Sequence, residues 1–427
     1  MNRFSGMKKW RKQRGQTLVF LTVFLVVFLL FIGLAVDFGL TFLTRARLTK
    51  AVDAACLNAA RNYTSTDSGA LAQAVATSAF SYNYGSYSRD TTPPAVTVTA
   101  TQDPNNAANM LLNCSCTATS KTFFMRVLPS WSTVSVTDSA VSKRATLVMT
   151  LVVDRSGSMS GDGGWSALKN AVPKFLAYFD NVNDYVGLVS FASYSTVDVP
   201  ITTTPGNFKT PIQTALNSLS PNGYTFSQGG LSNAITENNI PHPAGNVFKV
   251  IVFLTDGYAN IINDNLSCPG YANVNYGGCD PSQGSGCNTV TFLNPANGNT
   301  LCSVSNNGHP SCCAATQFYS YSAGGLVNFT ATNTYNDSVY RALQLATNLR
   351  TDANPTTIYS IGVGNSVNTT FLQEMANDPA SPTFDSTQPI GAAIFVPSCT
   401  SNNATCNADV LQAYQNIAAN ILLRLTQ

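Results

Sequence analysis

The chain is poor in charged side chains and in histidine. Only 10% of its 427 residues are charged and it has two histidines, whereas about 25% charged residues is usual for a soluble domain. Neither histidine lies in a motif, and no P-loop, Gly-rich dinucleotide turn or HExxH sequence occurs. Lys169 and Lys174 lack the context of a base that would activate a serine nucleophile. Catalysis is therefore poorly supported, and we expect a protein that is not an enzyme.

The basic residues are concentrated at the N-terminus. Six Lys or Arg and no acidic residue precede Gly15, so the rest of the chain is slightly acidic and has no apparent nucleic-acid-binding surface. Thr17 to Val36 is an uncharged run of 20 residues, the length that crosses a bilayer. A secretory signal peptide is the alternative, but the run is long and no clear cleavage site follows it. We expect residues 1–15 to be a cytoplasmic tail, with the chain beyond the anchor outside.

Eleven cysteines agree with an oxidising compartment, in which disulfides form. Cys56 lies in the helix that follows the anchor, and ten cysteines lie beyond it. They form no paired CxxC knuckles, and neither His242 nor His309 completes a zinc site. Cys399 and Cys406 most simply close a local loop. The disulfide candidates are Cys114, Cys116, Cys268, Cys279, Cys287, Cys302, Cys312, Cys313, Cys399 and Cys406.

The N-terminal part is predicted to contain one long helix and a small spacer. Residues 16–62 form the helix, and small side chains between Leu48 and Ala60 recur at helical spacing. This face packs either on the protein's own domain or on other membrane-anchored subunits. Residues 63–145 alternate at period two near 95–100, 122–127 and 133–137, which predicts an α+β or β-rich spacer with a helix near 71–80.

The first 60 residues resemble a known family. Arg14-Gly15-Gln16, the apolar run, Gly33 to Asp37 and Leu48 to Ala55 are similar to the N-terminal region of TadE- and TadG-like proteins of Tad (Flp) pilus assembly. Pilin-like members of that system are cut after a Gly that has a Glu five residues later, and here that position is Phe20. The resemblance implies a bacterial inner-membrane protein with a single span, associated with pilus or envelope proteins.

From residue 146 to 427 strands and helices alternate. Apolar strands are predicted at 146–153, 185–191, 247–254 and 357–363, with an edge strand at 197–202 and helices near 165–179, 208–219, 227–238, 334–350 and 410–425. This alternation predicts an α/β, doubly wound, Rossmann-like parallel sheet. Residues 257–333 interrupt it as a cysteine-rich insertion. The insertion is either a flap that shapes the ligand-binding edge or a passive addition away from it.

Oxygen-bearing side chains follow two of the predicted strands. Asp154, Ser156 and Ser158 follow the first strand, and Asp256 follows the strand at 247–254. Ligands bind at the carboxyl ends of the strands in this fold. The loop that contains Thr225 offers a further hydroxyl, and oxygen ligands suit Mg²⁺. A polar turn with a capping serine is the alternative for the first motif alone.

These five residues match, in order, the metal-ion-dependent adhesion site (MIDAS) of von Willebrand factor type A domains. The resemblance spans about 146–425. It implies that Ser156, Ser158 and often Thr225 contact Mg²⁺ (or Mn²⁺ or Ca²⁺), with Asp154 and Asp256 acting through waters or as alternates. The remaining metal position would take an acidic residue of a protein partner.

The expected function is metal-dependent protein binding or adhesion associated with Tad-type pilus assembly. The alternative is a structural subunit of the pilus or secretion apparatus, in which the N-terminal helix is the active part and the α/β domain is a stabilising head.

Overall fold

The computed structural model divides the chain into two compact units. One contains residues 1–59, 72–99 and 112–142, and the other contains 60–71, 100–111 and 143–427. The residues that the structure describes are 16–64, 69–85, 90–92, 94–105, 109–127, 129–161, 163–202, 206–241, 247–266, 271, 273–278, 289–305, 316–365, 367–400 and 404–426. The predicted basic tail, His242, His309 and the candidates Cys268, Cys279, Cys287, Cys312 and Cys313 lie outside them.

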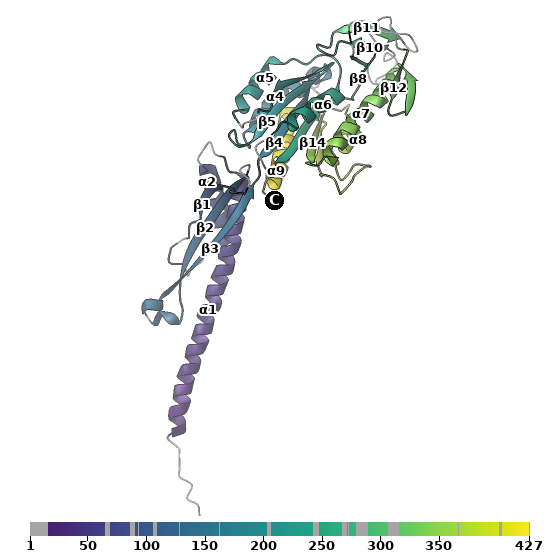
Figure 1. The fold of residues 1–427 in the computed structure, drawn as a ribbon. Coiled ribbons are helices and arrows are strands. Elements are labelled where there is room, and N and C mark those ends of the chain that lie inside the picture. Colours follow the sequence, from purple (N-terminus) through teal and green to yellow (C-terminus); the bar gives the residue numbers. More distant parts are fainter. Residues whose placement is uncertain are drawn as a thin grey trace, which may run out of the picture. The chain divides into compact units, whose positions relative to one another are not determined.

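The N-terminal unit is built on α1 (Gln16–Arg61), the long helix in purple in Figure 1. α2 (Ala70–Tyr84) and a sheet in the order β1-β2-β3 accompany it, with strands Thr97–Gln102, Met110–Lys121 and Thr133–Arg144. Within the described residues, α1 is the helix that is long and apolar enough to cross a membrane, by length and composition. Its apolar run lies exposed, as expected of a lipid-facing segment.

The small-residue face of α1 packs within the chain. Leu48, Ala51, Ala55 and Ala59 are fully buried, because small side chains let the sheet approach the helix closely. The Cys56 sulfur is joined to Cys114 of β2 by a disulfide. Of the two alternatives for this face, packing on the protein's own domain is the one that the structure bears out.

Two expectations for this unit are wrong. Cys116, a disulfide candidate, is a buried free thiol, and its neighbour Cys114 pairs with Cys56, which was not among the candidates. Alternation along β2 explains the choice, since Cys114 and Cys116 both point inward but Cys114 lies opposite Cys56. The strand predicted at 122–127 is a loop, which ends in the short 3₁₀ helices η2 (Met125–Val127) and η3 (Pro129–Trp131).

The second unit contains a six-stranded sheet in the order β15-β14-β7-β4-β5-β6. The strands are β4 (Leu147–Asp154), β5 (Tyr185–Phe191), β6 (Ser195–Val199), β7 (Phe248–Thr255), β14 (Thr356–Val363) and β15 (Ala392–Val396). All pairs are parallel except β5–β6. The doubly wound α/β prediction is confirmed, with one antiparallel edge. Every residue of β4 is buried, and its mostly apolar sequence is typical of a strand covered on both faces.

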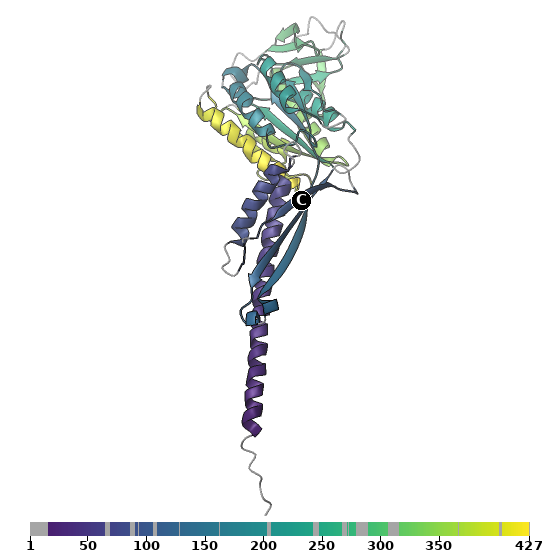
Figure 2. The ribbon, with the colours of Figure 1, turned by 90° about the vertical axis from the view of Figure 1, so that its left-hand side faces the viewer.

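Helices cover both faces of this sheet (Figures 1 and 2). Met149 and Leu151 of β4 belong to a core shared with helices α4, α5 and α9, whereas Val152 belongs to one shared with α6, α7 and α8. Phe175 of α4 lies 5.0 Å, between ring centroids, from Tyr414 of α9. The bounds are α4 Gly164–Leu176, α5 Lys209–Ser218, α6 Ser227–Asn238, α7 Ala331–Thr351, α8 Thr369–Ala376 and α9 Ala404–Arg424. The sequence did not predict α8 and β15.

The insertion has its own sheet and its own aromatic core. Strands β8 (Ile261–Asp264), β9 (Val274–Gly277), β10 (Thr289–Leu293) and β11 (Thr300–Ser305) form it, and β12 (Gln317–Ser320) pairs with β13 (Gly325–Asn328). The Tyr276 ring lies 5.2–5.5 Å from the rings of Phe292, Phe318 and Phe329. Cys302 is disulfide-bonded. The expected pair Cys399–Cys406 forms, with Cys406 in the first turn of α9.

Candidate metal centre

Two predicted site residues lie side by side where adjacent strands end. Asp154 is the last residue of β4, and Thr255 and Asp256 come at the end of β7, its parallel neighbour. The chain continues from β4 to β5 on one side of β4, and β7 lies on the other side. This is the switch point at which α/β sheets bind ligands. Thr255 Oγ1 donates a hydrogen bond to Asp154 Oδ2 at 2.5 Å.

The loop after β4 turns back over the strand end and brings both serines to Asp256. Ser156 N donates to Asp154 Oδ1 at 2.7 Å, which fixes the start of the turn. Ser156 Oγ and Ser158 Oγ are 3.0 Å apart. Ser158 Oγ donates to Asp256 Oδ1 at 2.8 Å, and Ser156 Oγ lies 3.4 Å from the same oxygen. Three side-chain oxygens from two segments about 100 residues apart in the chain thus meet at one point.

Thr225, from a third segment, lies near the cluster. A Cβ built on Gly257 would lie 3.7 Å from Thr225 Oγ1 and 4.0 Å from Ser158 Oγ, so both hydroxyls face the same small space. Asn260 holds Thr225 there: its Oδ1 accepts from Thr225 N at 2.8 Å, and its N donates to Thr225 O at 3.0 Å. Sequence reasoning missed Asn260, although it lies only four residues after Asp256.

The Thr225 loop depends on a glycine in the left-handed region. Gly223 has a φ of 80°, and a Cβ there would lie 2.4 Å from Ser193 Oγ. Only glycine meets both conditions without strain. Gly223 O accepts from Gly157 N at 3.0 Å, which ties the Thr225 loop to the serine loop. Backbone hydrogen bonds therefore connect the loop that carries Thr225 both to the loop of Ser156 and Ser158 and to the segment that contains Asn260.

The electrostatics of the cluster favour a cation. Asp154 is fully buried, and this desolvation raises the pKa of its carboxyl to about 6, against hydrogen bonds from Thr255 and Ser156 that lower it. Two carboxylates and three hydroxyls are neutral or anionic oxygen ligands, the set that suits Mg²⁺ and other hard ions. In the described part of the chain no three His, Cys, Asp or Glu residues gather to offer a rival metal site.

The insertion borders the cluster. Tyr224 Oη lies 3.3 Å from Thr291 Oγ1 of β10, and Asn275 Nδ2 of β9 donates to Ser193 O at 3.0 Å. Phe226 packs with Ile261 and Leu293. The described part of the insertion therefore lies against the loop that carries Thr225, and the interpretation of it as an addition away from the site is wrong.

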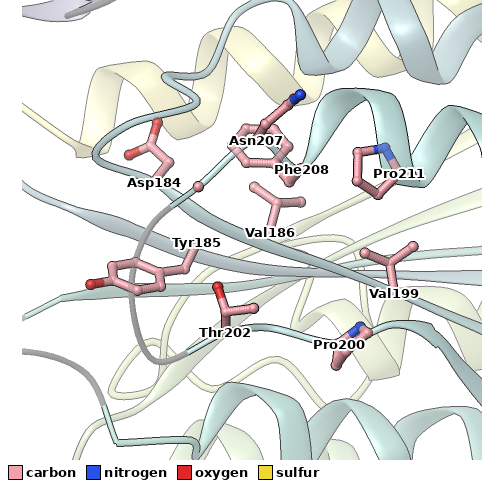
Figure 3. A pocket seen from close by; sticks show the side chains of 10 residues that line it. Asp184, Tyr185, Val186, Val199, Pro200, Thr202, Asn207, Phe208 and Pro211 are labelled. Atoms are coloured by element: carbon pink, nitrogen blue, oxygen red, sulfur yellow. The ribbon is translucent and has the colours of Figure 1, made fainter.

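A separate pocket lies at the other end of β5 (Figure 3). It has a volume of about 310 Å³ and includes Tyr185, the first residue of β5, and Phe208. Its acidic residue, Asp184, is engaged by a bidentate contact with Arg144, at 3.1 and 2.7 Å. None of the predicted metal ligands lines this pocket, and its side chains are otherwise mostly apolar.

Two family models match the chain. The von Willebrand factor type A domain matches residues 149–259, which include all five predicted ligands, and the putative Flp pilus-assembly TadE/G-like family matches residues 15–62. No curated protein sequence matches the chain.

Solved structures similar to the chain include the following three. The PilB minor pilin from Streptococcus sanguinis is 18% identical, with 78% of this chain and 79% of that chain covered and a TM-score of 0.39. The pilus adhesin SpaC from Lactobacillus rhamnosus GG is 15% identical, with 76% and 36% covered and a TM-score of 0.38. The proximal thread matrix protein 1 from the mussel byssus, with a zinc-occupied MIDAS motif, is 16% identical, with 65% and 46% covered and a TM-score of 0.35.

The chain spans only about half of the mussel protein and about a third of the pilus adhesin. Nothing about this chain's ligands follows from likenesses at this level. The two family matches and the fold together give the conclusion: this chain joins a TadE/G-like pilus-assembly segment to a von Willebrand factor type A domain.

Proposed function

We propose that the type A domain binds a protein partner through a divalent cation, as an anchored adhesion module of a Tad-type pilus system. The observation that carries the proposal is the convergence of Ser156, Ser158 and Asp256 oxygens within 3.4 Å of one another, beside Thr225. A cation that binds between these oxygen atoms would explain why they lie so close together.

The residues divide into two groups. Ser156, Ser158 and Thr225 would hold Mg²⁺ (or Mn²⁺ or Ca²⁺) through hydroxyl oxygens, with Asp256 as a direct or water-separated ligand. Asp154 would act on the ion indirectly, through water, because its oxygens already accept hydrogen bonds from Ser156 N and Thr255 Oγ1. A site with few anionic ligands leaves the ion able to attract a carboxylate from a partner. Because this role needs no group transfer, the proposed activity is binding and not catalysis.

The proposed location is the bacterial inner membrane. α1 would cross it once, with the N-terminus in the cytoplasm and the type A domain outside. The TadE/G-like match and the apolar run of α1 support the anchor, and the six basic residues before Gly15 support the orientation. The partner would be a pilus or envelope protein that supplies an acidic residue.

The test uses two serines of one loop. Ser158 is exposed and its Oγ belongs to the cluster, whereas Ser160 is exposed and its Oγ donates to Gly157 O. In the 427-residue protein, Ser158→Ala is expected to weaken Mn²⁺ binding by at least about 10- to 100-fold, the loss that removal of even an outer-shell partner of a metal ligand causes. Ser160→Ala is expected to bind like the wild type. Electron paramagnetic resonance of free Mn²⁺ measures both affinities.

The second readout addresses the carboxylate and the pilus. A glutamate-containing peptide should lower the water-proton relaxivity of bound Mn²⁺ by displacing a water ligand. Cells with Ser158→Ala should lose pilus-dependent adhesion, and cells with Ser160→Ala should keep it. Equal Mn²⁺ affinity of the two variants would refute the metal site. Normal adhesion without Mn²⁺ binding would instead favour the structural-subunit alternative.

A further inference from the structure

The loop between β2 and β3 is tied to α1 by one carboxylate. Asp37 of α1 is 2% exposed. Its Oδ1 accepts from Phe123 N at 2.6 Å, and its Oδ2 accepts from Phe124 N and Met125 N at 2.9 and 2.7 Å. Hydrogen bonds to a charged acceptor are among the stronger ones in proteins. These three hydrogen bonds therefore fix the loop beside Asp37 of α1.

Gly33 of α1 leaves room for the side chain of Phe124 in the loop. A Cβ on Gly33 would lie 2.9 Å from both Cβ and Cγ of Phe124, closer than real contacts allow. Gly33 lies one turn before Asp37, towards the middle of the apolar run. The loop thus contacts α1 within the last turn of the uncharged segment that ends at Val36.

The same loop exposes large apolar side chains, although they are costly to leave in water. Phe123 is 57% exposed, Phe124 46%, Trp131 53% and Val127 83%. Arg126 is the cation among them, with its guanidinium carbon 5.7 Å from the centre of the Phe123 ring. We call Phe123, Phe124, Val127 and Trp131 the aromatic loop.

The surface of α1 next to the aromatic loop is also apolar. Phe38 and Phe42, two and six residues beyond the end of the uncharged run, are 74% and 66% exposed. Exposed apolar patches of this kind mark interaction sites. Figures 1 and 2 show the β2–β3 hairpin running along α1 towards the helix's N-terminal half.

The length of the uncharged run of α1 places this surface relative to a bilayer. Twenty helical residues rise about 30 Å, which equals the thickness of the hydrocarbon core. If residues 17–36 fill that core, Gly33 to Asp37 lie at its outer boundary. Tryptophan and other aromatic rings favour that boundary, where the rings meet acyl chains and polar groups meet headgroups.

We propose that the aromatic loop is a second membrane contact, inserted into the outer boundary of the bilayer beside α1, with Arg126 at the lipid phosphates. The proposal rests on the membrane span of α1 proposed above, and continuity with that span selects lipid as the occupant. Two contacts at different points of one unit fix its direction on the membrane, because a single helix leaves the unit free to rotate and tilt. Asp37 is the positioning residue, since it holds the loop at this depth.

The experiment uses the three tryptophans of the 427-residue chain, reconstituted in vesicles of phosphatidylethanolamine and phosphatidylglycerol. Trp10→Phe removes the tryptophan of the N-terminal tail, and Trp165 is buried in the type A domain. Lipids brominated at shallow or deep acyl positions then quench the remaining emission. Shallow bromine is expected to quench more than deep bromine, and Trp131→Phe is expected to abolish the quenched component.

Two glycines of α1 provide a matched pair. Gly33→Ala is expected to reduce quenching of Trp131, because the new Cβ displaces Phe124. Gly39→Ala has open space around it and is expected to leave quenching unchanged. Equal quenching in both variants would refute the role of Gly33 in seating the loop.

Flotation of the same vesicles distinguishes failure of the proposed membrane contact from failure of the proposed anchor. Protein that floats with the vesicles but shows no quenching of Trp131 would overturn the membrane contact and leave the anchor standing. Trp131 shielded from aqueous iodide but not quenched by lipid would also overturn it, since a protein surface would then cover the loop. Protein that fails to float would overturn the anchor and this inference with it, while the metal-binding test remains valid.

Discussion

Asp37 and Asp256 are both buried carboxylates, yet their neighbours give them different capacities. Asp37 is surrounded by backbone N–H groups of residues 123–125, which can only donate. Asp256 faces the hydroxyls of Ser156 and Ser158, which donate or accept by rotation. When a cation arrives, hydroxyls can turn their lone pairs towards it, but amides cannot. The first environment therefore serves to hold a loop, and the second is suited to bind an ion.

The largest effect is expected at Asp37. Asp37→Ala leaves the partly buried amides of Phe123, Phe124 and Met125 without their acceptor, whereas a fully buried unsatisfied donor costs about 1–3 kcal/mol. We expect the hairpin tip to lose about 3 kcal/mol of stability in total. Hydrogen–deuterium exchange of these amides measures the change. Asp53→Ala, at an exposed position of the same helix, is the control, and equal protection in both variants would argue against the anchoring role.

The complementary change is Asp256→Asn. An amide keeps the size of the side chain but removes its charge, so we expect Mn²⁺ affinity to fall about 100-fold, about 2.7 kcal/mol. Asp37→Asn should leave Mn²⁺ affinity as in the wild type, because that carboxylate takes no part in the cluster. Calorimetric titration of both variants provides the comparison. A similar loss of Mn²⁺ affinity in both variants would mean that the affinity depends on the overall stability of the protein and not on the charge of Asp256.

A smaller effect is expected from the backbone that shapes the site. Gly223→Ala combines a φ of 80° with a Cβ 2.4 Å from Ser193 Oγ, and the left-handed region alone costs a non-glycine residue about 1–2 kcal/mol. We expect a matching drop in thermal stability and about a tenfold loss of Mn²⁺ affinity, since Thr225 shifts. Gly161→Ala, where a Cβ meets no atom within 4 Å, should change neither quantity.

The sequence predicts the α/β sheet well and the β2–β3 loop poorly, for a physical reason. β4 and β7 are short, mostly apolar runs rich in β-branched residues, which favour buried parallel strands, and the predicted ligand types recur after them in a recognisable order. Thr122 to Val127 has the same apolar character, but Asp37, more than 80 residues earlier, captures its amides and prevents strand pairing. A tertiary hydrogen bond of this kind leaves no trace in local periodicity.

Asn260 and Cys116 illustrate the same limit. Asn260 acts through its backbone and side chain on Thr225, 35 residues away, and no spacing in the sequence indicates this pairing. The thiol of Cys116 is left unpaired because Cys56 lies opposite Cys114, which depends on how α1 sits on β2. Candidate ligands can be recognised in a sequence because metal binding needs particular side chains, whereas positioning residues cannot, because many side chains can provide that role.

Hydrogen–deuterium exchange with and without Mg²⁺ shows whether the three loops bind a cation and whether the Asp37 contact does not. In the full-length protein, Mg²⁺ is predicted to slow exchange in residues 155–158, 222–226 and 256–260, the three loops whose oxygens meet. Residues 123–125, held by Asp37, are predicted to exchange at the same rate with and without Mg²⁺. Unchanged exchange in the three loops at saturating Mg²⁺, or a uniform change in both regions, would contradict the account.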